Sequence, residues 1–254
     1  MQDSECTHLC SIMPKQPARN EINMSPSRSL PTKLDPEEAP ITVTVGEGGH
    51  CRSFYIHPET AKYHSDFFVA ALRNEWKERT DKTIRLPEED PTVFRVFATF
   101  LYSGHICVPE YLPVDIDGDG PEDETGCMWI FLAQAWLLGE KLQSISFRDA
   151  IIDVMTMRAT EGTVFTAHVP ALVWPVSARM TCLKKFLVDV AAYSWDSETL
   201  RNSRVRNPLE FVEDLAAKML RSPVDWACVR GGCVYHEHLE MGKPCYKSMF
   251  PCCC

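Results

Sequence analysis

The first regular pattern of apolar and polar side chains begins with residues 41–45. These residues alternate strictly between apolar β-branched and polar side chains, as in a strand with one buried face. Glycines follow, and residues 51–56 return as the second strand of a hairpin. A third short strand is expected at residues 83–86, because Pro87 ends it. The pattern therefore predicts a small β-sheet.

Helical periodicity dominates the remainder of the chain. Apolar side chains recur three and four positions apart in several segments, which is typical of amphipathic helices. Ser65, Asp90 and Asn207 stand where three of these segments begin, and such side chains cap helices by accepting hydrogen bonds from backbone N–H groups. We expect helices from Asp66, from Pro91, over residues 128–142 and 145–157, across 183–191, and from Pro208 to about Arg221. The sequence therefore predicts the α+β fold class.

Composition divides the chain into four regions. Residues 1–39 are polar and contain many prolines, so we expect a disordered leader. Residues 40–160 contain the three strands and the first helices, and residues 161–222 form an all-helical extension. Residues 223–254 are a tail rich in cysteine and histidine, whose chemistry needs its own explanation.

The charge balance and the apolar segments exclude two kinds of partner. With 26 Lys and Arg against 35 Asp and Glu, the net charge is −9, and no basic block favours phosphate binding. Residues 1–20 lack the apolar run of a signal peptide, and residues 129–139 are too short to cross a bilayer. We therefore expect no nucleic acid and no membrane as partners, and a cytoplasmic or nuclear location. The 12 cysteines are then expected to be reduced thiols or metal ligands.

Short motifs follow one another in a fixed order after the first strand. They are Ile56-His57, Ser65 to Phe68, Leu86 to Phe94, Leu101 to Gly104, and Leu132 to Leu142 with the aromatic Trp136. In this order they resemble the motifs of the BTB/POZ domain, in particular those of the short BTB proteins of filamentous fungi. The resemblance covers residues 40–160 and implies a short sheet that caps a helical cluster. It also implies protein–protein interaction without catalysis, although one fold hosts many functions.

The resemblance implies particular partners as well. BTB domains form homodimers, and a dimer of this chain would use residues 41–45 and the first helix. Family members that bind the cullin scaffold of a ubiquitin ligase carry an apolar-x-Glu motif just after the L-Y-T-G helix end. Residues 108–110 stand at that distance from Tyr102, so the implied cullin contact is Tyr102, Val108 and Glu110. No kelch, MATH or zinc-finger domain that would capture a substrate is evident.

Other motifs fall short of the chemistry that they suggest. Residues 115–120 begin like a calcium-binding loop, but Gly126 stands where the loop needs a bidentate Glu. Residues 46–51 lack the last glycine of a dinucleotide fingerprint, and residues 236–240 lack the second histidine of a zinc-protease motif. His57 matches a structural histidine of the BTB family that joins the hairpin to the helices. We therefore expect no catalytic residues and no enzyme.

The tail contains the strongest candidate for a metal site. Two thiolates and two imidazoles, the ligands that tetrahedral zinc prefers, come from Cys233, His236, His238 and Cys245. Cys228 lies upstream of them. We expect a structural zinc, and the alternatives are a flexible cysteine-rich end, a zinc-dependent enzyme and a transcription-associated scaffold. Because so short a segment buries little apolar surface, we expect its order to depend on metal and the rest of the chain hardly to respond.

Overall fold

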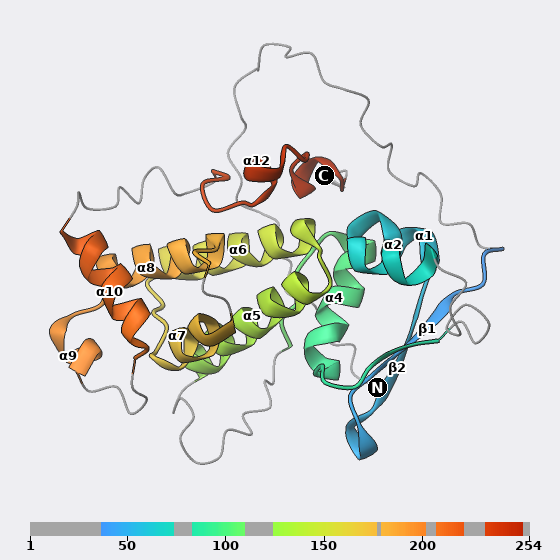
Figure 1. Cartoon of the computed structure of the whole chain (residues 1–254), viewed down its shortest axis with the longest axis horizontal. Coiled ribbons are helices and arrows are strands. Elements are labelled where there is room, and N and C mark those ends of the chain that lie inside the picture. The colour runs from blue at the N-terminus through green and yellow to red at the C-terminus, as the bar shows by residue number, and fades with distance from the viewer. Residues whose placement is uncertain are drawn as a thin grey trace, which may run out of the picture.

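The computed structural model describes residues 37–73, 83–109, 124–176, 179–201, 207–220 and 232–250. Figure 1 shows a small sheet at one end, long helices that run away from it, and the C-terminal segment lying across these helices. The class is α+β, mostly helical with a three-stranded sheet, as the sequence predicts. No helix in the described ranges is long and apolar enough to cross a membrane. The predicted leader lies almost wholly outside the described residues.

The sheet has the strand order β2-β1-β3. Strand β1 (Ile41–Val45) pairs antiparallel with β2 (Arg52–Ile56) and parallel with β3 (Thr83–Leu86), which confirms the three predicted strands. The hairpin turn begins at Gly46, whose φ of +83° suits glycine, and continues through η1 (Gly48–His50). The apolar face of β1 is buried in the chain's own core. That face is therefore not free for the dimer contact expected there.

Two short helices follow the hairpin, and the sequence pattern predicted only the second. Helix α1 (Pro58–His64) begins directly after β2. Proline fits the first position of a helix because its missing N–H would have no partner there. Helix α2 (Asp66–Arg73) has the predicted cap, since the Ser65 hydroxyl accepts a hydrogen bond from the Phe68 N–H at 3.2 Å. The same hydroxyl donates to the carbonyl of Leu142, which ties α2 to the helical cluster.

Helix α4 (Pro91–Ser103) has a capped start and a glycine end. The Asp90 carboxylate accepts hydrogen bonds from the Thr92 and Val93 N–H groups, at 2.6 and 3.0 Å, which confirms the predicted cap. The apolar face of the helix lies in the core. Gly104 ends the helix with a φ of +71°, a conformation that side chains other than glycine adopt only with strain.

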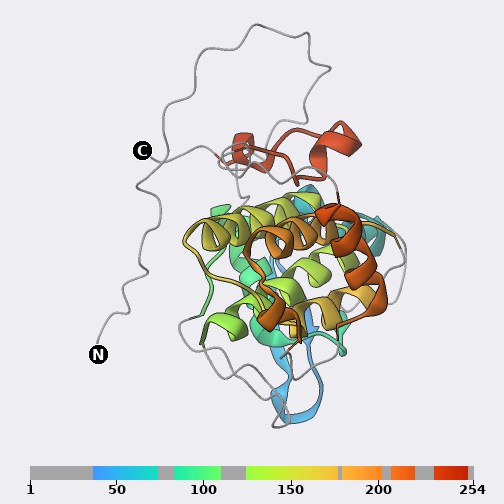
Figure 2. The same ribbon diagram turned by 90° about the vertical axis from the view of Figure 1, so that its left-hand side faces the viewer.

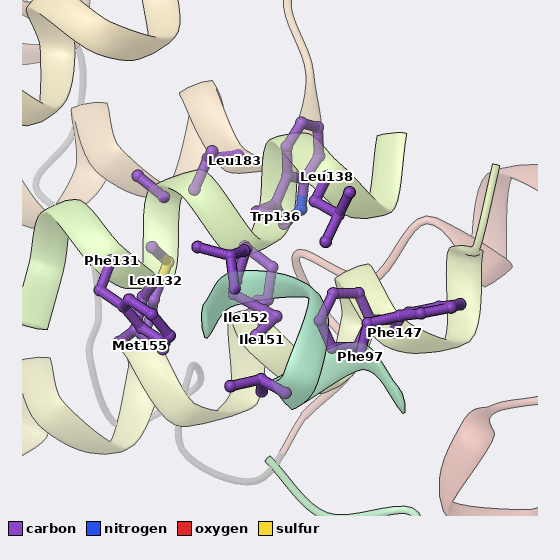
Figure 3. Packing of buried hydrophobic residues seen from close by; sticks show 14 of the residues in the cluster. Phe97, Phe131, Leu132, Trp136, Leu138, Phe147, Ile151, Ile152, Met155 and Leu183 are labelled. Atoms are coloured by element: carbon purple, nitrogen blue, oxygen red, sulfur yellow. The ribbon is translucent and has the colours of Figure 1, made fainter. Parts of the chain in front are cut away.

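The centre of the core is formed by α5 (Glu124–Lys141) and α6 (Ile145–Thr160), together with α4 and α8 (Cys182–Ser194). Figure 3 shows the packing of buried apolar side chains in this core, among them Phe97, Phe131, Leu132, Trp136, Leu138, Phe147, Ile151, Ile152, Met155 and Leu183. Residues 145–152 of α6 are all buried, and they include the carboxylate of Asp149. The buried part of α6 therefore includes polar and charged side chains as well as apolar ones.

Short helices around α8 form the predicted helical extension. They are α7 (His168–Val173), η2 (Trp174–Val176), α9 (Ser197–Arg201) and α10 (Leu209–Met219). The rings of Trp195 and Phe211, with centroids 5.4 Å apart, join the end of α8 to α10. Pro208 is the N-cap of α10 and no side chain caps it, so the prediction of Asn207 as the cap is wrong. The extended backbone of Pro208 moves the helix start one residue past the expected position.

The C-terminal segment 232–250 lies along α6, as the two views in Figures 1 and 2 agree. It contains α12 (His238–Met241) and η3 (Tyr246–Ser248). Tyr235 is 6% exposed and His236 is 2% exposed. Polar and aromatic side chains of the segment contact α6, whereas the alternative of a flexible cysteine-rich end implies no such packing. The other residues of the predicted tail lie outside the described ranges.

Candidate metal centre

Four side chains of segment 232–250 converge on one point. Their ligand atoms all lie within 4.8 Å of one another and belong to Cys233, His236, His238 and Cys245. The two sulfur atoms are 3.9 Å apart, and the Cys245 sulfur is 3.9 Å from Nδ1 of His236. Tetrahedral zinc with ordinary bond lengths places its ligand atoms roughly 3.3 to 3.8 Å apart. The predicted cluster can therefore hold a metal ion after small movements.

Tight turns bring the four ligands together. The His236 N–H donates to the Cys233 carbonyl at 3.1 Å, so the first two ligands share a turn. Helix α12 begins at His238 and ends at Met241, and the φ of +61° at its C-cap, Gly242, allows the chain to reverse. Cys245 then stands at the N-cap position of η3. The spacing of the ligands in the sequence thus reflects turns on either side of one short helix.

His238 is held by a carboxylate of α6. Its Nδ1 lies 2.7 Å from an oxygen of Asp149, whose side chain is only 1% exposed. The same carboxylate accepts the backbone N–H groups of Glu237, at 2.7 Å, and of His238, at 3.4 Å. With Nδ1 engaged, Nε2 is the nitrogen of His238 that is available to a metal.

His236 contacts its carboxylate through the other ring nitrogen, Nε2. Its Nε2 lies 3.1 Å from an oxygen of Asp153, one turn farther along α6. The Tyr246 hydroxyl and the Lys247 ammonium donate to the second oxygen of Asp153, at 2.5 and 2.9 Å. This arrangement leaves Nδ1 of His236 available, and that atom is the one 3.9 Å from the Cys245 sulfur.

Burial and neighbouring groups shift the proton affinities around the cluster. Burial, and to a smaller extent the nearby Cys233 thiol, raise the pKa of the Cys245 thiol to about 11. Burial also acts to raise the pKa of Asp153, but the hydrogen bond and charge of His236 and the charge of Lys247 outweigh it. The pKa of Asp153 therefore lies below its usual value. A divalent cation would act against burial at the thiols, because it stabilises thiolates.

Contacts beyond the four ligands also fix segment 232–250 to the core. The Tyr235 hydroxyl donates to Asp189 of α8 at 2.7 Å. At the other end, Phe250 stacks on His64 of α1, with ring centroids 5.1 Å apart. A Cβ atom added at Gly104 would overlap the Phe250 ring, so this ring packs directly on the end of α4. The segment thus bridges helices that are far apart in the sequence.

Asp149 and Asp153 were not among the residues singled out from the sequence. One signal was present, because the two carboxylates stand four residues apart in the mostly apolar segment 145–157. That spacing places both on one face of a helix. A charged helix face usually meets water, however, and only the fold brings these side chains to the histidines.

Of the implied cullin contact, only Tyr102 and Val108 lie among the described residues. Tyr102 is 42% exposed, but its hydroxyl accepts a hydrogen bond from the His57 backbone N–H at 3.0 Å and lies 3.1 Å from Nδ1 of that residue. His57 thereby joins β2 to α4, which fits the structural role expected for it. Val108 is partly buried against the core, and Glu110 lies outside the described residues.

A cavity of about 370 Å³ lies beside α12 and the starts of α6 and α8. A zinc-dependent enzyme would need a nearby acid or base such as Glu237, and Glu237 is one of the residues that line this cavity. Its carboxylate is paired with Arg148 at 2.7 Å, and both side chains are largely buried. Burial raises the pKa of Glu237, while the charge of Arg148 acts to lower it. Among the described residues, Glu237 is therefore the acidic partner of an ion pair with Arg148.

Two further sequence candidates, residues 115–120 and Cys228, lie outside the described residues. Comparison of the chain with protein-family models found no match, and no curated protein proved similar to it. The geometry of the chain's own residues is therefore what supports a function.

Proposed function

We propose that the chain is a non-catalytic protein–protein interaction module of the BTB/POZ type with a structural zinc centre. In this proposal zinc binds Cys233, His236, His238 and Cys245 and locks segment 232–250 onto α6. The observation that carries the metal assignment is the set of four converging ligand atoms. Each imidazole also has its second nitrogen held by a carboxylate, as is usual for metal-binding histidines.

The donor types favour zinc, and their number favours a structural role. Calcium and magnesium take oxygen ligands, whereas two thiolates and two imidazoles suit tetrahedral zinc. A catalytic zinc keeps one position for water, whereas a structural zinc has four protein ligands. A site with four protein ligands supports a scaffold and speaks against the zinc-dependent enzyme. The transcription-associated scaffold differs from this proposal only in its partner.

The order of the elements supports the interaction half of the proposal. A hairpin, two helices, a parallel third strand and a helical cluster follow one another, in the order of the BTB-like motifs. The motif residues Asp90 and Gly104 begin and end α4. We propose two partners, a cullin scaffold and a second copy of the chain, which would contact a surface other than the buried apolar face of β1. The cullin would contact the exposed side of Tyr102 and the segment that leads to Glu110.

Zinc content tests the metal half of the proposal. Protein purified without added metal, and without a metal-binding tag, should contain about one zinc per chain. The double variant Cys233→Ala, His236→Ala should contain none, while Cys107→Ala, an exposed cysteine outside the cluster, should keep the metal. X-ray absorption should show two sulfur and two nitrogen neighbours. Wild-type protein without metal would overturn the zinc centre, and a water ligand beside three protein ligands would revive the enzyme.

Sedimentation and affinity purification test the interaction half. We expect a homodimer at micromolar concentration and capture of a cullin by the wild-type chain. Glu110→Lys should abolish the capture, because it reverses the charge at the motif, and should leave zinc content unchanged. Val108→Asp is a poorer variant, since Val108 packs against the core and a charge there would disturb the fold. A wild-type monomer that captures no cullin would overturn this half.

A further inference from the structure

The carboxylates behind the two histidines stand one helical turn apart on α6. Asp149 contacts Nδ1 of His238, and Asp153 contacts Nε2 of His236. We propose that these carboxylates are positioning residues that select opposite ring nitrogens as zinc ligands, Nε2 of His238 and Nδ1 of His236. The inference rests on the proposed zinc centre and goes beyond it, because it assigns the proton and the ligand atom of each ring.

The physical reason is that a neutral imidazole has one N–H group. When one ring nitrogen binds a metal, the proton resides on the other, and the hydrogen bond made there fixes the orientation of the ring. Asp149 is nearly inaccessible to water, so water competes little for the Nδ1 proton of His238. At His236 the carboxylate holds Nε2, while Nδ1 lies 3.9 Å from the sulfur of Cys245.

The opposite orientations agree with the way segment 232–250 crosses α6. The two histidine rings are 5.1 Å apart between centroids and are inclined by 67°. Their carboxylates lie four residues apart on one helix face, roughly 6 Å from each other. Two rings that converge on one ion must therefore diverge toward separate carboxylates. The observed contacts achieve this with a different nitrogen on each ring.

The two carboxylates are themselves held by different groups. Asp149 accepts two backbone N–H groups of the segment, from Glu237 and His238. Asp153 accepts the side chains of Tyr246 and Lys247. These extra donors restrain each carboxylate independently of the imidazole ring that it contacts. We therefore expect each aspartate to orient its own ring.

Nitrogen NMR on the wild-type protein tests the assignment without any substitution. In zinc-loaded full-length chain with ¹⁵N-labelled histidine, the proton should reside on Nδ1 of His238 and on Nε2 of His236. If both rings carry zinc but have the proton on the same nitrogen, the inference is overturned and the zinc centre stands. If neither ring binds zinc, the proposed function and the inference that rests on it both fail.

Zinc affinity of matched variants provides the second test. Asp149→Asn and Asp153→Asn should each weaken zinc binding roughly ten- to a hundredfold in a competition titration with a chromophoric chelator. Asp189→Asn is the control, because Asp189 also binds the segment, through Tyr235, but touches no ligand. Its zinc affinity should hardly change. If both aspartate variants lose no more affinity than the control, the inference is overturned.

Asp153→Asn is the variant that keeps this test informative if Asp149→Asn does not fold. The Asp153 side chain is 23% exposed, against 1% for Asp149, so its substitution disturbs the core less. A ten- to hundredfold loss in Asp153→Asn, with the circular dichroism of the wild type, supports the positioning role. An affinity equal to that of Asp189→Asn overturns the role for His236.

Discussion

The sheet and the C-terminal segment are attached to the same helical core by different means. In β1 the side chains of Ile41, Val43 and Val45 are buried among apolar neighbours. Segment 232–250 instead buries two histidines, which contact carboxylates of α6. Apolar burial is indifferent to metal ions, whereas contacts between ionisable groups that surround a metal site are not. Strand β1 and segment 232–250 should therefore detach from the helical core under different conditions.

The largest effect is expected from removal of the proposed zinc. A strong chelator should release segment 232–250, because zinc bound by four protein ligands contributes on the order of 10 kcal/mol to the order of a small site. Hydrogen exchange should increase at residues 235–246 and stay unchanged at 41–45. The thermal transition of the whole chain should also fall, since the segment packs on α6, and this replaces the expectation that the core would not respond.

Two outcomes would contradict this difference between the regions. Equal exchange in the segment with and without the chelator would mean that its contacts with Asp149, Asp153 and Asp189 suffice to order it. Loss of protection in β1 together with the segment would mean that the two regions unfold as one unit. The zinc-free double variant should match the chelated wild type if the metal alone is responsible.

The separation of interacting residues along the sequence decides how much of the structure could be predicted. The start of α4 was predictable because Asp90 accepts hydrogen bonds from residues only two and three positions away. The four candidate ligands were predictable because their chemistry is evident from residue type. The docking of the segment was not, because His238 and Asp149 are 89 residues apart and each resembles a solvent-exposed polar residue in the sequence.

Local signals failed where two interpretations of one residue compete. Proline ends a strand but also fits the first turn of a helix, and so α1 was missed at Pro58. Asn207 has a capping side chain, yet the extended backbone of Pro208 makes that residue the N-cap. Periodicity does not distinguish these alternatives, because the packing of neighbouring elements determines where the chain bends.

The second prediction concerns His64, where the segment meets α1. Its ring stacks on Phe250, and burial lowers its pKa to about 4. The unfolded chain has a histidine pKa of about 6.5, so between pH 6.5 and pH 4 the unfolded chain binds a proton that the folded chain does not. Stability contributed by neutral His64 is therefore present above pH 6.5 and is lost as the pH falls toward 4. The loss should approach about 3 kcal/mol.

Urea unfolding of the wild type and His64→Gln at pH 7 and pH 5 measures this effect. Glutamine does not titrate, so the variant should lose less stability than the wild type between the two pH values. Excess zinc in both samples makes the effect of acid on the metal site common to them. An equal loss in both proteins would show that the burial of His64 does not set the acid response.

The third prediction uses two glycines with positive φ to separate backbone strain from packing. Gly104 has a φ of +71° and lies under the Phe250 ring, whereas Gly162 has a φ of +86° and, among the described residues, open space where a Cβ atom would stand. Gly162→Ala should cost about 1 kcal/mol through strain alone, and Gly104→Ala about 2 kcal/mol because it also displaces Phe250. Equal changes in the free energy of unfolding would mean that Phe250 contributes nothing to holding the segment.

The smallest expected effect compares the cap that exists with the cap that was wrongly predicted. Asp90→Ala removes the acceptor for the Thr92 and Val93 N–H groups and should cost about 1 kcal/mol in the free energy of unfolding. Asn207→Ala should change it by at most about 0.5 kcal/mol, because Asn207 caps no helix and its side-chain oxygen has no hydrogen-bond partner among the described residues. Chemical denaturation of both variants measures the difference. A larger loss at Asn207 than at Asp90 would contradict the assignment of Asp90 as a helix cap and of Asn207 as a residue that caps no helix.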